Sequence, residues 1–458
     1  MPTSADPAAA KGNGAHTRPD RFRIISPPGA ADRLSVTDFF AHMPSHSYIF
    51  RPSRELWPAA SVDGRLPLVK SGPEHRPIRA SRWLDKHRAV EQLTWAPGES
   101  ELIEGQLIDS SGGWIAQPGC RVFNLYRPPN CEEGEPQRAE RWVEHVRALY
   151  GEESLHIIRW LAHRVQRPGE KINHALVLGG AQGIGKDTIL EPVSYAVGPW
   201  NMREASPIAL LGRFNPFLKS VILRVSEARD LGDVDRYSLY DHMKVITAAP
   251  PDVLRIDEKN RGEYAIPNVT GVIVTTNHKG DGLFLPVDDR RHFVAWSSKS
   301  KDDFRTGHFD AMWTWYRAGG MRDVAAYLRS IDIGAFDAKA PPRKTTAFFD
   351  IADANRAPEE EDLADVLEAL MNPEAVTLPI LADQARAMKS DALAVFLEDS
   401  VRNGRKIPHR LESAGYVPVR NSDADDGRWK IAGRRRAVYA RAELSVRDRI
   451  AAARRLVG

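Results

Sequence analysis

The stretch Lys171–Leu190, KINHALVLGGAQGIGKDTIL, is the part of this chain that decides its fold class. An apolar run, Ala175–Leu178, leads into a glycine-rich turn that has the form G-x-x-x-x-G-K from Gly180 onward. A buried strand before the turn and a helix over Asp187–Ala196 are predicted around it. Backbone N–H groups of such a turn and the start of the helix bind phosphate oxygens, and the lysine adds a positive charge. The stretch therefore predicts a nucleotide-binding site.

The residues predicted to surround the phosphates come from the turn and the start of the helix. They are Gly180, Ala181, Gln182, Gly183, Ile184, Gly185, Lys186, Asp187 and Thr188. The usual residue after the lysine is Ser or Thr, whose hydroxyl binds magnesium. Here Asp187 stands in that place and Thr188 follows it, so one of the two is expected to hold Mg²⁺, directly or through water.

Composition sets the class of protein. With 458 residues, a prior of about 150 residues per domain predicts roughly two to four domains. We find no apolar run long enough for a bilayer and no secretory signal, so we expect a cytoplasmic protein without a membrane partner. Cys120 and Cys131 are the two cysteines, which excludes a four-cysteine zinc site. The net charge of +3 excludes a strongly basic nucleic-acid coat.

The order of segments predicts an α/β protein with several parts. We expect a flexible arm over residues 1–35 and a smaller, mixed or β-rich domain over 36–140. Residues 141–335 alternate strand-like and helix-like segments, as a parallel-sheet nucleotide-binding domain does. A linker over 336–362 and a further domain over 363–458 follow.

A phosphate site hydrolyses ATP only with an acid placed near the metal. The run Ser220–Val225 predicts a buried strand, and Ser226-Glu227 follows directly. Acids at the carboxyl end of a parallel strand lie beside the phosphate loop, so Glu227 is the candidate to activate water or to contact magnesium. Asp230 is a weaker candidate. The alternative is that Glu227 caps the next helix.

Two further elements of an ATPase follow in order. Gly271–Thr276 predicts another buried strand, and Asn277 after it could hold the attacking water; the alternative is a turn-forming Asn. Arg290 and Arg291 then follow two acids and have the pattern of an inter-subunit arginine finger; the alternative is a solvated charge cluster. Their order after Lys186 favours the functional interpretation of each.

These motifs together resemble superfamily 3 helicases, in particular the helicase domains of phage and plasmid primase-helicases. The resemblance covers Gly151–Trp296 and rests on GGAQGIGKDT, VILRVSEARD, VLRIDEKNRGEY, GVIVTTNH and DDRRHF, in that order. It implies an AAA+-type ATPase core that works as a ring, a homo-hexamer, around single-stranded DNA in a central pore. ATP would bind between subunits, with Lys186 and Glu227 on one side and Arg290 or Arg291 from the neighbour.

The resemblance also implies that Lys259 lies on a pore hairpin that grips DNA. A lysine and an arginine, Lys259 and Arg261, at a hairpin tip can contact phosphates, although an ordinary solvated hairpin is the alternative. The chain departs from the family at Asp187 and lacks a second acid beside Glu227. Many relatives carry a primase or polymerase domain, but residues 36–140 are short and have no D-x-D pair. We therefore expect a collar there, and a primase or polymerase only as a separate partner.

The last part of the chain is its basic pole. Val401–Gly458 holds 15 Arg and Lys against 6 Asp and Glu. Helices over Ser390–Val401 and Lys406–Ala414, then strands over Tyr416–Arg420, Trp429–Ala432 and Ala437–Arg441, predict a winged-helix-like domain. The residues expected to contact duplex or origin DNA are Arg405, Lys406 and Arg410 on the recognition helix and Arg434, Arg435 and Arg436 on the wing. Alternatives are a protein-docking winged helix and simple arginine enrichment.

The sequence thus predicts an ATP-dependent DNA helicase or translocase with ATP and Mg²⁺ as cofactors. It would act in phage, prophage or plasmid DNA replication in the cytoplasm of a bacterial host. The alternatives are a small-substrate (nucleotide) kinase with a phosphate loop, and an initiator or scaffold in which ATP only locks the ring.

Overall fold

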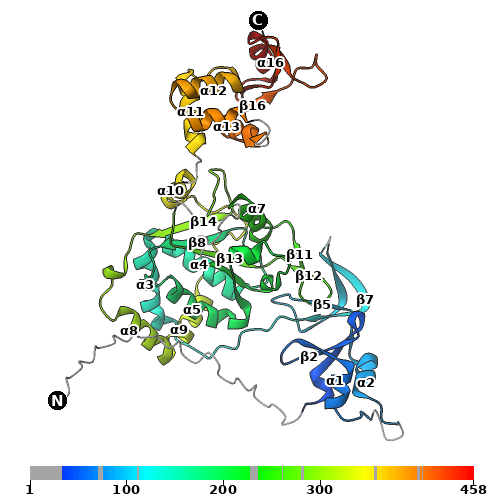
Figure 1. Ribbon diagram of the computed structural model, residues 1–458. Helices are drawn as coiled ribbons and strands as arrows, with labels where there is room; N and C mark the ends of the chain where they lie inside the picture. The colour runs from blue at the N-terminus through cyan, green and yellow to red at the C-terminus, as the bar shows by residue number, and fades with distance from the viewer. Residues whose placement is uncertain are drawn as a thin grey trace, which may run out of the picture. The chain divides into compact units, whose positions relative to one another are not determined.

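The computed structural model of the chain (Figure 1) divides into two units. It describes residues 34–70, 76–110, 113–226, 236–259, 261–279, 283–354, 358–399, 403–404 and 406–457. The first unit takes Met1–Leu93 and Gly119–Phe123, and the second takes Thr94–Pro118 and Asn124–Gly458. In the described part of the chain, no helix has both the length and the apolar character needed to cross a bilayer.

The first unit is built on a mixed four-stranded sheet with the order β3-β2-β1-β4. Its elements are β1 (Phe39–His42), β2 (Ser47–Phe50), β3 (Glu55–Pro58), α1 (Ala59–Arg65), α2 (Ala80–His87) and β4 (Ala89–Val90). Strand β1 pairs antiparallel with β2 and parallel with β4. Alternate apolar residues of β1 and β2 and the inner faces of both helices form its core, which includes Phe39, Tyr48 and Leu84. Three further strands, β5 (Gln92–Thr94), β6 (Leu102–Asp109) and β7 (Gly113–Asn124), form a sheet of order β5-β7-β6.

The centre of the second unit is a five-stranded parallel sheet with the order β14-β8-β13-β10-β9. The strands are β8 (Ala175–Gly180), β9 (Met202–Ala205), β10 (Ile222–Ser226), β13 (Gly271–Thr276) and β14 (His292–Ser297). Every residue of β8 and β13 is buried, as expected for parallel strands covered on both faces. The predicted α/β class and the strands expected ahead of Gly180, Glu227 and Asn277 are confirmed.

Helices connect and cover these strands (Figure 1). They are α3 (Glu140–Tyr150), α4 (Ser154–Gln166), α5 (Lys186–Val197), α6 (Pro207–Leu210), α7 (Arg236–Thr247), α8 (His308–Trp315), α9 (Met321–Ser330) and α10 (Thr346–Ala354). Among them, α3 packs on β14, α7 packs on β13, and α9 packs on α4 and α5. A two-stranded hairpin, β11 (Val253–Ile256) with β12 (Tyr264–Pro267), leaves the sheet between β10 and β13 in the chain order.

The C-terminal part of the second unit has a core of its own. Its elements are α11 (Pro358–Ala369), β15 (Ala375–Thr377), α12 (Leu378–Ala387), α13 (Asp391–Glu398), α15 (Lys406–Ser413), β16 (Tyr416–Val419), β17 (Trp429–Ile431), β18 (Arg434–Arg436), β19 (Val438–Arg441) and α16 (Val446–Arg455). Leu363, Leu381, Leu393 and Leu411, one from each of four helices, meet in that core. The strands form a sheet of order β15-β19-β16 and a separate hairpin, β17-β18.

The strand pairing in this part differs from the hairpin expected between Tyr416–Arg420 and Trp429–Ala432. The sequence predicted no strand at Arg434–Arg436, yet β18 forms there and pairs with β17, whereas β16 pairs with β19. The cause is a two-residue turn at Ala432 and Gly433, whose φ angles are 47° and 75°. Positive φ at both turn residues matches the twist of a tight hairpin, so the chain reverses there. The positions of the expected domain boundaries stay predictions.

Candidate functional site

The glycine-rich turn links the interior strand β8 to helix α5, as the predicted strand and helix required. Gly180 and Gly185 have φ angles of 139° and 91°, which side-chain-bearing residues rarely adopt. A Cβ on Gly185 would lie 2.6 Å from Nε2 of His145 and 2.7 Å from a ring carbon of Phe309. Glycine is therefore required there by both φ and space. Because α5 begins at Lys186, the first N–H groups of the helix have no intrahelical acceptor and are available to an anion.

Lys186 and Asn277 meet at the carboxyl edge of the sheet. The Lys186 Nζ atom donates to Oδ1 of Asn277 at 2.6 Å, and to the carbonyls of Gly180 and Ala181 at 2.6 and 2.8 Å. The contact forms because β13, which ends just before Asn277, is the direct neighbour of β8. Lys186 is 8% exposed, and burial lowers the pKa of its ammonium group. The two residues that were singled out separately in the sequence thus share one site.

The two residues after the lysine have different surroundings. Thr188 is buried, and its carbonyl accepts a hydrogen bond from the Tyr316 hydroxyl. The Asp187 side chain is 66% exposed and forms an ion pair with Arg224, with 2.6 Å between Oδ1 and Nη2. Exposure therefore favours Asp187 over Thr188 as the residue that can approach a magnesium ion.

The predicted acids Glu227 and Asp230 lie outside the described residues. Strand β10 ends at Ser226, so Glu227 follows the carboxyl end of a strand that pairs directly with β13. Within the described residues, no group of three or more His, Cys, Asp or Glu side chains is placed to hold a metal ion. The donors that surround the loop, one ammonium, one guanidinium and the N–H groups at the start of α5, fit phosphate oxygens.

The arginine pair lies at the opposite end of the sheet from the glycine-rich loop. His292, the first residue of β14, pairs with Ala175, the first residue of β8, so Arg290 and Arg291 precede the amino edge. Five residues of strand separate that edge from Gly180, or about 16 Å. Arg290 is exposed, whereas Asp289 beside it is buried and accepts from Tyr240 at 2.8 Å. The pair therefore does not join the loop of its own chain.

The predicted DNA contacts on the hairpin divide into two kinds. Lys259 lies in the turn between β11 and β12 and is exposed. Arg261 instead donates to Glu258 at 2.8 Å, and Glu258 also binds Lys219 at 2.5 Å and Tyr264 at 3.0 Å. Its side chain is 20% exposed, so this network holds the Arg261 guanidinium in the hairpin.

The predicted C-terminal contacts are also not equivalent. Arg405 lies outside the described residues, and Lys406 is the first residue of α15. The Arg410 guanidinium lies over the Phe396 ring, 4.1 Å from its centroid, and so packs against α13. On β18, Arg434 and Arg435 are exposed and Arg436 is partly buried, and Arg435 pairs with Asp426 at 2.9 Å.

Sequence reasoning missed three side chains next to the loop. Arg224 was the one charged residue inside an apolar strand, a signal that could have identified it. His145 lies beside Gly185, with 3.4 Å between the His145 Nε2 atom and the glycine carbonyl oxygen. The other ring nitrogen of His145 contacts His308. Burial lowers the pKa of His145 to about 4. The aliphatic chain of Lys301 lies 3.8 Å from where a Cβ on Gly183 would be.

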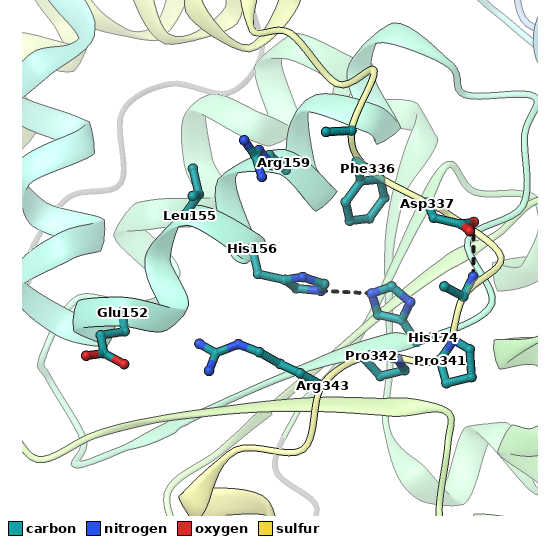
Figure 2. Close-up of a pocket in the computed structure, with 12 residues that line it drawn as sticks. Glu152, Leu155, His156, Arg159, His174, Phe336, Asp337, Pro341, Pro342 and Arg343 are labelled. Atoms are coloured by element: carbon teal, nitrogen blue, oxygen red, sulfur yellow. Dashed lines mark hydrogen bonds between the residues drawn. The ribbon is translucent and has the colours of Figure 1, made fainter.

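A separate pocket of about 360 Å³ lies away from the loop (Figure 2). His156 and His174 bond through their Nε2 atoms at 2.9 Å, and Arg159 and Arg343 also line the pocket. Burial lowers the pKa of His156 to about 4, helped by the guanidinium charges, and that of His174 to about 3. Because His174 directly precedes β8, this pocket is at the amino edge of the sheet and is separate from the glycine-rich loop.

Comparisons with known proteins agree with the fold described above. The model of a family of unknown function, DUF5906, matches residues 178–291. A search of curated proteins gives no match. The chain is similar to the apo structure of the C-terminal region of NrS-1, with a TM-score of 0.57 and 14% identity over 86% of this chain and 93% of that chain. An A form apo structure of the same region gives a TM-score of 0.56 at 15% identity, over 88% of this chain and 96% of that one.

Proposed function

We propose that the chain is an ATP-dependent DNA helicase or translocase that works as a ring in phage, prophage or plasmid DNA replication. The observation that carries the proposal is the 2.6 Å bond between Lys186 and Asn277, which are 91 residues apart in sequence. A loop lysine beside an amide from the neighbouring parallel strand supports this proposal, because both groups can act on a bound triphosphate. The lysine neutralises phosphate charge, and the amide can orient water at the γ-phosphate.

The proposed roles follow from position on the sheet. Lys186 and the N–H groups at the start of α5 hold the phosphates, and Asn277 orients the attacking water. Glu227, directly after β10, accepts the proton from that water. Bound magnesium would supply Lewis-acid stabilisation of the phosphate charge, with Asp187 as the candidate ligand.

The arginine pair is proposed to act on a neighbouring subunit. Arg290 and Arg291 lie at the amino edge of the sheet. They do not contact the loop of their own chain, because the amino end of β8 is about 16 Å from Gly180. In a head-to-tail ring, each subunit presents a different surface to each neighbour, so the amino edge of one chain can face the loop of the next. This arrangement supports an AAA+-type homo-hexamer with ATP sites between subunits.

The C-terminal part is proposed to be a winged helix that binds duplex or origin DNA. Its order, α11-β15-α12-α13-α15-β16-hairpin-β19, and its sheet order, β15-β19-β16, support that architecture. The exposed Arg434 and Arg435 lie on the hairpin that would be the wing. Single-stranded DNA would pass the β11-β12 hairpin in the ring, where Lys259 is exposed.

Measuring ATP hydrolysis with and without single-stranded DNA tests the proposal. We expect DNA to stimulate turnover, and Glu227→Gln to abolish hydrolysis and strand separation while ATP binding persists. A nucleotide kinase would show transfer to an acceptor nucleotide and no DNA stimulation. An initiator or scaffold would keep its function after Glu227→Gln. Either result would replace the helicase proposal.

A mixing experiment tests the shared site. Lys186→Ala and the double variant Arg290→Ala/Arg291→Ala should each be inactive alone. In mixed rings, about a quarter of sites would combine an intact lysine with an intact arginine pair from the neighbour, so ATP hydrolysis should reappear. Mixtures that stay inactive, or particles that remain monomeric in electron micrographs with ATP and DNA, would contradict the inter-subunit site.

A further inference from the structure

The phosphate loop has a second cation beside it, the guanidinium of Arg224. This residue lies in the middle of β10, which is separated from β8 by one strand, β13. Its Nη2 atom is 2.6 Å from Oδ1 of Asp187, in the first turn of α5, and its Nε atom is 3.4 Å from the Thr275 hydroxyl on β13. The side chain therefore crosses the neighbouring strand and ends at the place where the loop passes into the helix.

The two partners of this ion pair are held unequally. Arg224 comes from a buried strand, has a second contact on β13 and is 20% exposed, whereas the Asp187 side chain is 66% exposed. An ion pair with one partner in solvent is weak, because water and salt ions stabilise the carboxylate once it separates from the guanidinium. Asp187 can thus turn away while Arg224 stays in place. A phosphate group carries more charge than a carboxylate and can accept from two N–H groups of a guanidinium at once. It is therefore the stronger partner for Arg224.

The positive charge of Arg224 also lies close enough to Lys186 to affect the charge of that lysine. Burial lowers the pKa of Lys186, the carboxylate of Asp187 acts against that shift, and the positive charge of Arg224 adds to it. Two cations that repel one another across a loop of free N–H groups form a site whose potential favours a polyanion. In the usual form of this loop, magnesium balances part of the negative charge of the phosphates. The hydroxyl that follows the lysine holds this magnesium. Here that hydroxyl is replaced by the carboxylate of Asp187.

We propose that Arg224 exchanges Asp187 for the phosphates of a bound nucleotide, and that this second cation lets the site bind ATP without Mg²⁺. The inference rests on the proposed nucleotide site and adds a phosphate-binding residue to it. Magnesium would remain necessary for hydrolysis, so binding and turnover would differ in their need for the metal. Asp187, released from Arg224, would then be available to the metal when it arrives.

Calorimetric titration with ATP, once with excess Mg²⁺ and once with EDTA, tests this inference. For the unaltered chain we expect affinities that differ by less than about threefold between the two conditions. Arg224→Met should lose at least about tenfold in EDTA, the loss of one charge-assisted contact, and much less with Mg²⁺. Asp187→Asn should bind ATP more tightly in EDTA, because the competing carboxylate is gone.

Three further variants make the outcome decisive. Arg203→Met removes an exposed arginine from the adjacent strand β9, opposite Leu223, and should leave both affinities unchanged. Arg224→Lys keeps the charge without the paired N–H groups and should lie between the unaltered chain and Arg224→Met. Lys186→Ala should lose ATP in both conditions. Thermal melting of each variant separates a binding defect from unfolding.

Two results would be informative in different ways. If the unaltered chain loses ATP in EDTA as completely as Arg224→Met does, the role given to Arg224 is wrong, and the nucleotide site with its metal still stands. If no nucleotide binds in either condition, the proposed function itself fails.

Discussion

At the scale of single residues, the proposed nucleotide site is assembled from side chains that lie far apart in the sequence. The loop from Gly180 to Lys186 was predictable because glycine spacing, a preceding apolar strand and a following helix are local signals. The partner of Asp187 was not, because Arg224 is 37 positions later and its side chain crosses an intervening strand to reach the loop. Arg261 was misjudged for a local reason. It lies in a basic turn, and the sequence gave no sign that its guanidinium pairs with Glu258 three residues earlier.

Asn277 gives a prediction that belongs at this scale. Asn277→Ala removes the amide that contacts Lys186, so ATP should still bind within a few-fold, while the hydrolysis rate should fall by on the order of 10²-fold. Nucleotide titration and steady-state ATP hydrolysis measure the two effects separately. His278→Ala, a change at the next residue, serves as the control and should leave hydrolysis near its original rate. Full turnover by Asn277→Ala would assign the amide a structural role.

At the scale of elements, strand existence was easier to predict than strand pairing. The buried strands β8, β10 and β13 were expected from continuous apolar runs. Their order in the sheet was not predicted. The strand β18 was missed because three arginines carry no apolar alternation, and the turn before it decides the pairing. Local turn geometry therefore overrode the weak strand propensity of Arg434–Arg436.

The β11-β12 hairpin carries a proposed DNA contact, Lys259, and a structural contact, Arg261. Lys259→Ala should weaken single-stranded DNA binding and reduce its salt dependence by about one phosphate contact, without a change in melting temperature. Arg261→Ala should instead destabilise the hairpin, because it removes a partner from the carboxylate of Glu258. Fluorescence anisotropy with labelled DNA at several salt concentrations, alongside thermal melting, distinguishes the variants. Equal loss of DNA binding in both variants, with an unchanged melting temperature for Arg261→Ala, would show that the ion pair opens on DNA.

The β17-β18 hairpin carries the corresponding prediction for duplex DNA. Arg434→Ala combined with Arg435→Ala should lower duplex affinity and reduce the slope of log affinity against log salt by about two. Arg147→Ala, which removes an exposed arginine from α3, is the matched control and should leave this slope unchanged. Electrophoretic mobility shifts at graded salt provide the measurement. An unchanged slope in the double variant would favour the protein-docking alternative for this domain.

At the scale of the whole molecule, buried imidazoles make stability depend on pH. Burial lowers the pKa of His145 and His156 to about 4 and that of His174 to about 3, against about 6.5 in an unfolded chain. Below pH 6.5 the unfolded chain binds protons that the folded chain does not, so the folded state loses stability as the pH falls toward 4. Each imidazole contributes a slope of about 1.4 kcal/mol per pH unit within that window.

Urea unfolding at pH 7.5, 6.5, 5.5 and 4.5 measures this dependence. His156→Gln should reduce the slope of unfolding free energy against pH, because a neutral amide replaces one titrating ring. Leu155→Gln, a change at an exposed neighbouring residue that does not titrate, should leave the slope unchanged. A free energy that stays constant from pH 7.5 to 5.5 would show that these imidazoles accept protons within the folded protein.

The imidazole of His145 has a practical consequence for following the site in solution. Its Nε2 atom contacts the carbonyl of Gly185, the residue directly before the phosphate-loop lysine, and its other nitrogen contacts His308. A ligand that reorganises the loop must change the magnetic environment of this ring, whether or not hydrolysis follows. Selective ¹⁵N labelling of histidine would therefore make His145 a spectroscopic reporter of loop occupancy, independent of any coupled enzyme assay.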